Sequence, residues 1–272
     1  SSKIYSICMN ILDEIWDYKK KFVNKLKQEK PLDDFKSLAY NNYYPPNNYF
    51  LNYLLKNSKN NMTSIIGEVK RASPSAGKLA NFKNIYDIAK EYYNIREISC
   101  ASVLTDEKYF NGSIDDLVSF SQKFHRPVLR KDFIVDEYQI YETKVSLGHC
   151  ILLIATKLKD KEIEHFSNVA KDIGLDVILE IHSKDEAHRA NNTDIKMVGI
   201  NNRNLADFSV TLSNCVDLAS ILKNKLVIGE SGIKTREDIK FVRKNSEIKT
   251  FLIGESLMKS KNRALFAKNL TK

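Results

Sequence analysis

Residues 127–155 read PVLRKDFIVDEYQIYETKVSLGHCILLIA, and this stretch indicates how most of the chain folds. The apolar residues at 127–131 and 150–155 predict two short strands, and 136–147 between them has the spacing of an amphipathic helix. Strands rich in Val, Ile and Leu are typical of a parallel sheet that helices cover on both faces. The stretch is therefore one strand–helix–strand unit.

The same alternation continues on both sides of this unit. Strict alternation of strands and helices predicts a parallel α/β sheet. Eight units favour a closed (β/α)8 TIM barrel over an open doubly wound sheet. No GxGxxG motif follows the first strand to support a dinucleotide-binding fold. The predicted strands are 64–69, 97–104, 127–131, 150–155, 176–181, 196–201, 225–229 and 249–253, and the helices are about 83–93, 113–123, 136–147, 158–172, 183–190, 212–222, 234–244 and 256–268.

The first part of the chain does not follow this rhythm. Apolar residues with helical spacing predict a helix over 7–28, and Pro31 limits it. Residues 41–62 are rich in Asn and Tyr and predict an irregular connector with one short helix around 48–56. We therefore expect residues 1–62 to form an N-terminal helical extension that packs on the barrel, and residues 63–272 to form the catalytic barrel domain.

Composition restricts the class of protein. Hydrophobic residues make up 43% of the chain and charged residues 28%, which is ordinary for a soluble globular protein. No run approaches the roughly 18 apolar residues of a membrane span, so we expect no membrane partner. The N-terminal residues lack the pattern of a signal peptide, and the four scattered cysteines predict reduced thiols. We expect a cytoplasmic protein, or an organellar one if a presequence has been removed.

The formal net charge of +9 raises nucleic acid as a partner. However, Lys and Glu are mixed along the chain, and no nucleic-acid-binding motif is present. The five histidines are scattered and show no metal-ligand spacing. We therefore predict a small anionic substrate, no nucleic acid and no metal.

Polar residues follow the apolar part of several predicted strands. Because side chains alternate along a strand, Ile66, Glu68 and Lys70 share one face. Each such residue alone could be a solvated cap or part of a surface ion pair. Their repetition at one end of the repeat favours a common pocket, because barrel enzymes build their sites at the carboxyl ends of the strands. The converging residues are Glu68, Lys70, Lys131, Glu180, Asn201 and Glu230.

Lysines near carboxylates suit general acid–base catalysis, because burial and neighbouring charges move their pKa values. A Schiff-base lysine at Lys131 is the alternative, and spacing alone leaves both open. The sequences ESGI at 230–233 and IGES at 253–256 match the phosphate site that barrels often build after their last two strands.

Several ordered motifs resemble indole-3-glycerol phosphate synthase. They are GEVKRASPSAG, ASVLTDEKYFNGS, PVLRKDFIVDEYQIYE, ILLIA, LEIHS, GINNRNL, IGESGI and FLIGESLM, and the resemblance runs from about residue 62 to 262. It extends weakly to 11–27. The resemblance implies a carboxy-lyase of tryptophan biosynthesis that needs no cofactor and converts 1-(2-carboxyphenylamino)-1-deoxyribulose 5-phosphate into indole-3-glycerol phosphate.

The resemblance also implies roles for individual residues. Lys131 is the expected general acid of ring closure, Lys70 pairs with Glu68 and meets the substrate carboxylate, and Glu180 is the acid–base carboxylate of dehydration. Asn201 and Glu230 hold Glu180 and the substrate hydroxyls, and the division of proton transfers between the two lysines stays open. The phosphate would meet Ser73, Arg203, Ser231, Gly232, Gly254 and Glu255, and Phe110 and Phe133 would line the anthranilate pocket.

Two points remain, the expected partners and the rival functions. Other enzymes of the tryptophan pathway are expected as partners. The rival functions are a non-catalytic barrel that binds phosphate esters and another sugar-phosphate barrel enzyme.

Overall fold

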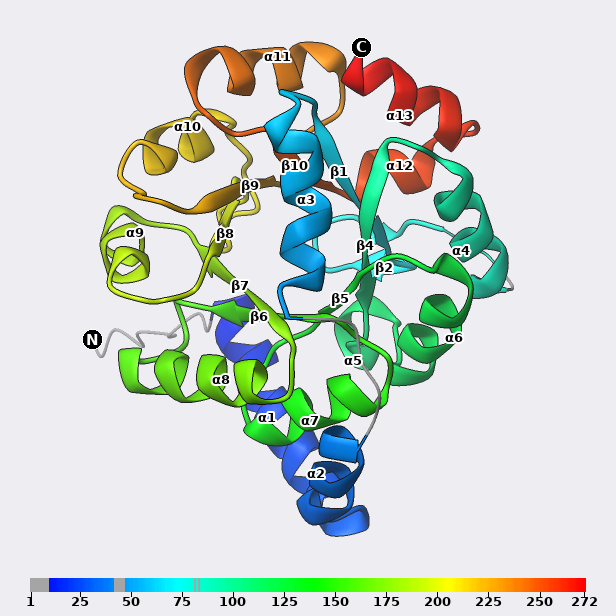
Figure 1. Cartoon of the computed structure of the whole chain (residues 1–272), viewed down its shortest axis with the longest axis vertical. Helices are drawn as coiled ribbons and strands as arrows, with labels where there is room; N and C mark the ends of the chain where they lie inside the picture. Colours follow the sequence, from blue (N-terminus) through cyan, green and yellow to red (C-terminus); the bar gives the residue numbers. More distant parts are fainter. Residues whose placement is uncertain (1–9, 42–46, 81, 83) are drawn as a thin grey trace, which may run out of the picture.

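The barrel predicted from the alternating pattern is confirmed by a computed structural model, which describes residues 10–41, 47–80, 82 and 84–272. Eight parallel strands close in the order β1-β10-β9-β8-β7-β6-β5-β4 (Figure 1). Each predicted strand is present, with ends that differ from the prediction by at most one residue. The strands are β1 (Ser64–Val69), β4 (Ile98–Leu104), β5 (Val128–Lys131), β6 (Cys150–Ile154), β7 (Asp176–Ile181), β8 (Met197–Asn201), β9 (Leu226–Glu230) and β10 (Thr250–Ile253).

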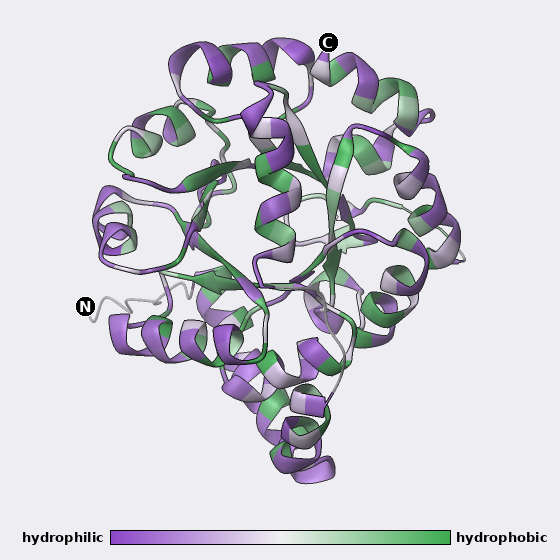
Figure 2. Cartoon of the chain, viewed as in Figure 1, coloured by the Kyte–Doolittle hydropathy of each residue, from purple (hydrophilic) through white to green (hydrophobic). Residues whose placement is uncertain are grey.

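Helices surround the barrel and turn their apolar faces inward, as the green stripes in Figure 2 show. Side chains at helix starts, such as Ser113, Asp136 and Thr235, accept hydrogen bonds from backbone N–H groups of the first turn and so define where helices begin. The helices between strands are α4 (Ile85–Asn94), α6 (Ile114–Phe124), α7 (Glu137–Val145), α8 (Asp160–Asp172), α9 (Lys184–Asn191), α10 (Ser213–Ala219) and α11 (Arg236–Asn245).

The predicted single helix over 256–268 is wrong. The chain forms α12 (Glu255–Lys259), leaves the helical conformation at Ser260, and starts again as α13 (Arg263–Thr271). The side chain of Asn262 accepts a hydrogen bond from the Leu265 N–H at 2.9 Å. The cap of the new helix interrupts the apolar sequence pattern for only a few residues. The pattern therefore predicts one continuous helix where the structure has two.

A short hairpin and a short helix in the loops also went unpredicted. Antiparallel β2 (Ala72–Ser73) and β3 (Gly77–Lys78) form a hairpin after β1, and α5 (Glu107–Phe110) follows β4. Both lie over the carboxyl ends of the strands and contact each other. Elements this short carry too few residues for a periodic signal.

The segment before the barrel is more helical than predicted. It forms α1 (Ile11–Glu29), α2 (Leu32–Asn41) and α3 (Tyr49–Lys59). The short helix predicted around 48–56 is confirmed as α3, which ends a few residues later, whereas α2 was missed. Pro31 ends α1 as predicted, but it stands directly before α2, where a fixed φ favours helix initiation. The starts of the predicted helices at 7 and 83, and residues 42–46 of the connector, lie outside the described residues.

The helices of this segment cover different ends of the barrel. Phe50 and Leu54 of α3 are fully buried against the strands, and the Leu51 N–H donates to Asp176 at the start of β7 at 3.1 Å. Helix α1 instead lies beside α7 and reaches the carboxyl ends of the strands. The division into an extension and a barrel after residue 62 stays a prediction.

No helix within the described ranges is long and apolar enough to cross a membrane.

Candidate active site

An open cavity of about 1190 Å³ lies at the carboxyl ends of the barrel strands. Every residue that the sequence assigned to catalysis or binding lines this cavity. Their convergence follows from the fold, because parallel strands in a closed barrel end at the same rim. The lining includes Glu68, Lys70, Ser73, Phe110, Lys131, Phe133, Glu180, Asn201, Arg203, Glu230, Ser231, Gly232, Gly254 and Glu255.

Two lysines share one carboxylate on the cavity floor. The Nζ of Lys70 lies 3.0 Å from Glu68 Oε1, and the Nζ of Lys131 lies 3.2 Å from Glu68 Oε2. The hydroxyl of Ser102 also donates to Glu68 Oε2, at 3.1 Å. Burial raises the pKa of the Glu68 carboxyl, but Lys131 and Lys70 more than offset this and lower the pKa to about 2. Glu68 is therefore ionised at neutral pH.

The same contacts keep Lys131 charged. Burial by itself lowers the pKa of this ammonium, but the carboxyl groups of Glu68, Glu230 and Glu180 raise it well above its ordinary value. A lysine that holds its proton this firmly can act as an acid only when a reacting group close by becomes more basic.

Two further carboxyl groups, those of Glu180 and Glu230, form a pair. Burial and the charge of Glu180 raise the pKa of Glu230 well above its usual range. Burial also raises the pKa of Glu180, but His182, the hydrogen bond from Glu230, and Lys131 lower it overall. Of the two carboxyl groups, Glu230 is therefore the one that favours the protonated form, and Glu180 is the one that favours the ionised form. We call Glu68, Lys70, Lys131, Glu180 and Glu230 the reaction cluster.

Two glycines make room for these carboxyl groups. A Cβ atom at Gly199 would overlap Oε1 of Glu230, and one at Gly254 would lie 2.9 Å from Oε1 of Glu68. Glycine, which has no Cβ, lets the backbone approach another group closely. In this barrel the close approach is to the buried carboxyl groups themselves.

Asn201 connects the reaction cluster to the predicted phosphate side. Its Nδ2 lies 3.5 Å from Glu180 Oε1, while its Oδ1 accepts from the Arg203 N–H at 3.0 Å and from the Ser231 hydroxyl at 2.9 Å. Ser231 and Gly232 both have positive φ, so the chain turns sharply after β9. The guanidinium of Arg203 donates to the Phe208 carbonyl at 3.2 Å and lies 3.8 Å from Glu255.

An apolar wall faces the same cavity. The rings of Phe110 and Phe133 lie 6.1 Å apart between centroids, at 39° to each other. Ile11, Leu12 and Ile15 of α1 also line the cavity. Sequence reasoning missed these three, because their helical spacing indicates a buried face without indicating what covers it.

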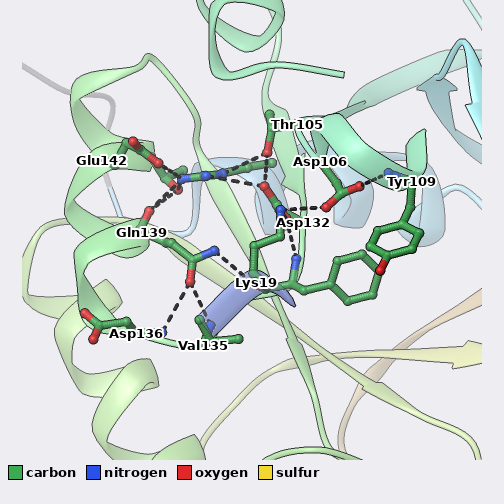
Figure 3. A network of polar contacts seen from close by, with 12 residues as sticks. Lys19, Thr105, Asp106, Tyr109, Asp132, Val135, Asp136, Gln139 and Glu142 are labelled. Atoms are coloured by element: carbon green, nitrogen blue, oxygen red, sulfur yellow. Dashed lines mark hydrogen bonds and ion pairs between the residues drawn. The ribbon is translucent and has the colours of Figure 1, made fainter. Parts of the chain in front are cut away.

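A second group of buried charges joins α1 to the strand that carries Lys131 (Figure 3). Lys19 Nζ lies 2.6 Å from Asp106 Oδ1 and 3.0 Å from Asp132 Oδ1, and all three side chains are almost fully buried. Arg130 lies 3.4 Å from Asp132 and 2.8 Å from Glu142. We call Lys19, Asp106, Arg130, Asp132 and Glu142 the anchor cluster.

The anchor cluster holds both sides of the apolar wall. Asp106 caps α5, which ends at Phe110, by accepting from the Tyr109 N–H at 2.7 Å. Asp132 follows Lys131 directly and accepts from the Phe133 N–H at 2.8 Å. No local pattern in the sequence identified Lys19 as the partner of Asp132.

Within the described ranges, no group of His, Cys, Asp and Glu side chains could hold a metal ion. Cys100, Cys150 and Cys215 are buried free thiols, and Cys8 lies outside the described residues. The buried thiols agree with the expectation of reduced cysteines that act as small apolar side chains.

Comparison with known proteins gives consistent results over almost the whole chain. A family model described as indole-3-glycerol phosphate synthase matches residues 12–270. The protein of that name from Caldanaerobacter subterraneus subsp. tengcongensis is 41% identical over 251 residues, which are 92% of this chain and 93% of the relative. The one from Clostridium kluyveri is 42% identical over 251 residues, with the same coverage of 92% and 93%.

Solved structures resemble the chain in fold. Tryptophan synthase subunit alpha from Legionella pneumophila superposes with a TM-score of 0.60 at 12% identity, covering 83% of this chain and 97% of that one. The 3-hexulose-6-phosphate synthase of Salmonella typhimurium gives a TM-score of 0.60 at 9% identity, covering 76% and 96%. At such identities the likeness concerns the barrel fold alone.

Proposed function

Because the chain belongs to the indole-3-glycerol phosphate synthase family, we propose that its cavity closes the indole ring of indole-3-glycerol phosphate. The substrate is 1-(2-carboxyphenylamino)-1-deoxyribulose 5-phosphate, and CO₂ and water leave, in one step of tryptophan biosynthesis. The observation that carries the proposal is the reaction cluster, in which two ammonium groups bind one carboxylate beside two carboxyl groups whose pKa values are shifted in opposite directions.

Ring closure uses the acid in this cluster. The ring carbon that bears the substrate carboxylate attacks the ketone carbon, and the electron pair of the C=O bond moves to oxygen. The developing alkoxide is far more basic than Glu68, so Lys131 can donate its proton there despite its raised pKa. The carboxylate then leaves as CO₂, and the electrons of the broken C–C bond restore the aromatic ring.

Dehydration uses the carboxyl pair. Glu180 is ionised and removes a proton from the new five-membered ring, while the hydroxyl formed from the ketone leaves as water after protonation by Lys70, or by Lys131 after it has regained a proton from solvent. The lowered pKa of Glu180 favours its ionised form, and the raised pKa of the neighbouring Glu230 favours its protonated form. Asn201 supports Glu180 from the other side, at 3.5 Å.

Substrate binding divides between the two sides of the cavity. The anthranilate ring lies against Phe110 and Phe133, and its carboxylate meets Lys70. An interaction that binds the substrate carboxylate equally in the ground state and in the transition state does not raise kcat. Lys70 must therefore hold the substrate carboxylate only loosely. The phosphate lies at the opposite side of the site, against Ser73, Arg203, Ser231, Gly232, Gly254 and Glu255. Here the N–H groups of Gly232 and Gly254 and the Arg203 guanidinium supply donors.

A small phosphorylated substrate is the partner that family membership supports. Association with other enzymes of the tryptophan pathway and a cytoplasmic location stay predictions.

Turnover of the aminodeoxyribulose phosphate tests the proposal directly. The product has indole fluorescence, and CO₂ should appear in equal amount. We expect Lys131→Ala to reduce kcat by about 10²–10⁴-fold, the range for loss of a general acid. A wild-type signal no larger than that of the variant would exclude the synthase function.

The same experiment separates the rival functions. Calorimetric binding of the substrate without turnover would indicate a phosphate-ester-binding barrel. Covalent trapping of the substrate by borohydride at Lys131 would indicate Schiff-base chemistry and another class of barrel enzyme.

A further inference from the structure

A carboxylate lies on the side of the cavity that receives the phosphate in the proposed function. Glu255, the first residue of α12, lines the cavity together with Arg203 and Lys259. An ionised carboxylate and a phosphate repel each other, so this side chain cannot attract the phosphate while it is charged. None of the steps of ring closure or dehydration uses it.

The two oxygens of Glu255 contact two different cations. Oε1 accepts a hydrogen bond from Nζ of Lys259, one helical turn later, at 2.7 Å. Oε2 lies 3.8 Å from Nη2 of Arg203, whose guanidinium is proposed to bind the phosphate. The other terminal nitrogen of Arg203, Nη1, donates to the Phe208 carbonyl at 3.2 Å. Glu255 thus pairs with the second terminal nitrogen of the guanidinium.

Glu255 is ionised in this arrangement. The hydrogen bond from Lys259 lowers the pKa of Glu255 below its ordinary value, and the charges of Lys259, Lys70 and Arg203 act in the same direction. Partial burial of the carboxyl group acts against these effects but does not cancel them. At neutral pH the side chain therefore places a negative charge beside the guanidinium.

Another acidic side chain of the cavity lining, that of Asp238, is bound elsewhere. Its carboxylate accepts hydrogen bonds from the N–H groups of Lys234 and Thr235, both at 2.8 Å, and completes the cap of α11. Among the described residues, Glu255 is the one carboxylate that forms an ion pair with Arg203. A phosphate that binds Arg203 must therefore compete with Glu255.

We propose that Glu255 is an internal competitor of the substrate phosphate, which pairs with Arg203 in the free protein and gives up this contact when the phosphate binds. Lys259 holds the carboxylate during the exchange, because its hydrogen bond is shorter than the contact with Arg203. The proposal rests on the proposed placement of the phosphate at Arg203. Such competition weakens the binding of substrate and product alike, so it favours release of a product that carries the same phosphate.

Binding of inorganic phosphate to the full chain tests the proposal without turnover. Glu255→Gln keeps the size of the side chain and removes its charge, so phosphate should bind about tenfold more tightly than to wild type in calorimetry at constant ionic strength. Glu237→Gln is the matched control, because it removes an exposed carboxylate from the first turn of α11. This control should change the affinity by less than about twofold, since solvent and salt screen an exposed charge.

Other results of this measurement would overturn the proposal. Unchanged or undetectable phosphate binding in Glu255→Gln would show that the carboxylate does not compete for Arg203. Weaker binding in this variant would mean that Glu255 instead holds the guanidinium in place for the phosphate.

A double-mutant cycle separates the role of Lys259 from direct binding of phosphate. In Lys259→Met the carboxylate is left to Arg203, so phosphate should bind about threefold to tenfold more weakly than to wild type. In a Glu255→Gln background the same change at Lys259 should have almost no further effect, because the competitor is already absent. An equal loss in both backgrounds would mean that Lys259 binds the phosphate itself, and would refute the exchange.

Kinetics connect the exchange to the reaction. In Glu255→Gln, KM should fall about fivefold and kcat should not rise, because tighter binding that is equal in ground and transition states does not accelerate the chemical step. Turnover with the same KM in wild type and in Glu255→Gln would refute the role of Glu255 and leave the synthase function standing. Wild-type protein without turnover would refute the synthase function, while the phosphate measurements would still decide the role of Glu255.

Discussion

The reaction cluster and the anchor cluster contain the same groups in different arrangements. Each has two cationic side chains and three carboxyl groups, and both are largely buried. In the anchor cluster every carboxylate has a cation within 3.4 Å. In the reaction cluster both lysines bind Glu68, and the neighbouring carboxyl groups of Glu180 and Glu230 have pKa values shifted in opposite directions.

The difference teaches how one barrel rim can serve both stability and chemistry. A buried charge that is fully paired has a strongly preferred protonation state and resists change. A carboxyl pair that faces an open cavity can gain or lose a proton when a substrate arrives. The anchor cluster lies directly behind Lys131 and Phe133, so the paired charges hold the reactive ones in place.

The strongest test of this comparison is Lys19→Met. The change leaves Asp106 without a cation and Asp132 with Arg130 alone, in a region where water does not reach either carboxylate. We expect a loss of about 3–5 kcal/mol in the free energy of unfolding, measured in urea. Lys20→Met, at an exposed position of the same helix, should change it by less than about 0.5 kcal/mol. Equal stability of the two variants would show that the anchor cluster does not hold α1.

A smaller effect, on kcat rather than on stability, is expected at the reaction cluster. Gly199→Ala places a methyl group where Oε1 of Glu230 lies, so the carboxyl group must move. Displacement of a catalytic group by about 1 Å can lower kcat about 100-fold. In a Glu230→Ala background the same methyl group meets no carboxyl group and should have almost no further effect. Additive losses in the double variant would contradict the overlap.

The smallest expected effect concerns pH. Glu230 has a raised pKa in the folded protein, so its contribution to stability is complete below about pH 4.5 and is lost as pH rises toward the folded value. Glu230→Gln keeps a donor to Glu180 at every pH. Relative to wild type, the variant should therefore gain about 1 kcal/mol in the free energy of unfolding between pH 5 and pH 6.

The anchor cluster should show the opposite dependence. Burial raises the pKa of Asp132, but Lys19 and Arg130 more than offset this and lower it below its usual value of 3.8. The stability it contributes is present above that value and is lost as pH falls through the folded pKa. In Asp132→Asn the acid-side loss below about pH 4 should be smaller than in wild type, in a urea series. If wild type and Asp132→Asn lost the same free energy of unfolding at low pH, this would argue against the pairing of Asp132 with Lys19 and Arg130.

Much of the fold and of the candidate site could be predicted from the sequence. The alternation of strands and helices identified the barrel, and the strand-end positions of Glu68, Lys131 and Glu180 indicated a shared rim. Motifs supplied the rest of the predicted lining. The predictions failed where a short local feature competed with periodicity, as at Asn262 between α12 and α13 and at Pro31 before α2.

The sequence by itself determined which strand-end side chains meet at the cavity, because a parallel barrel brings all its strand ends to one rim and the period of two sets which side chains face inward. It did not determine which charges pair. Lys19 reaches Asp106 and Asp132 across a large separation in the chain, and Glu230 rather than Glu180 favours the protonated form because of burial and of the contact between Glu180 and His182. Desolvation and the distances between charges depend on the packed structure, so only the tertiary fold decides them.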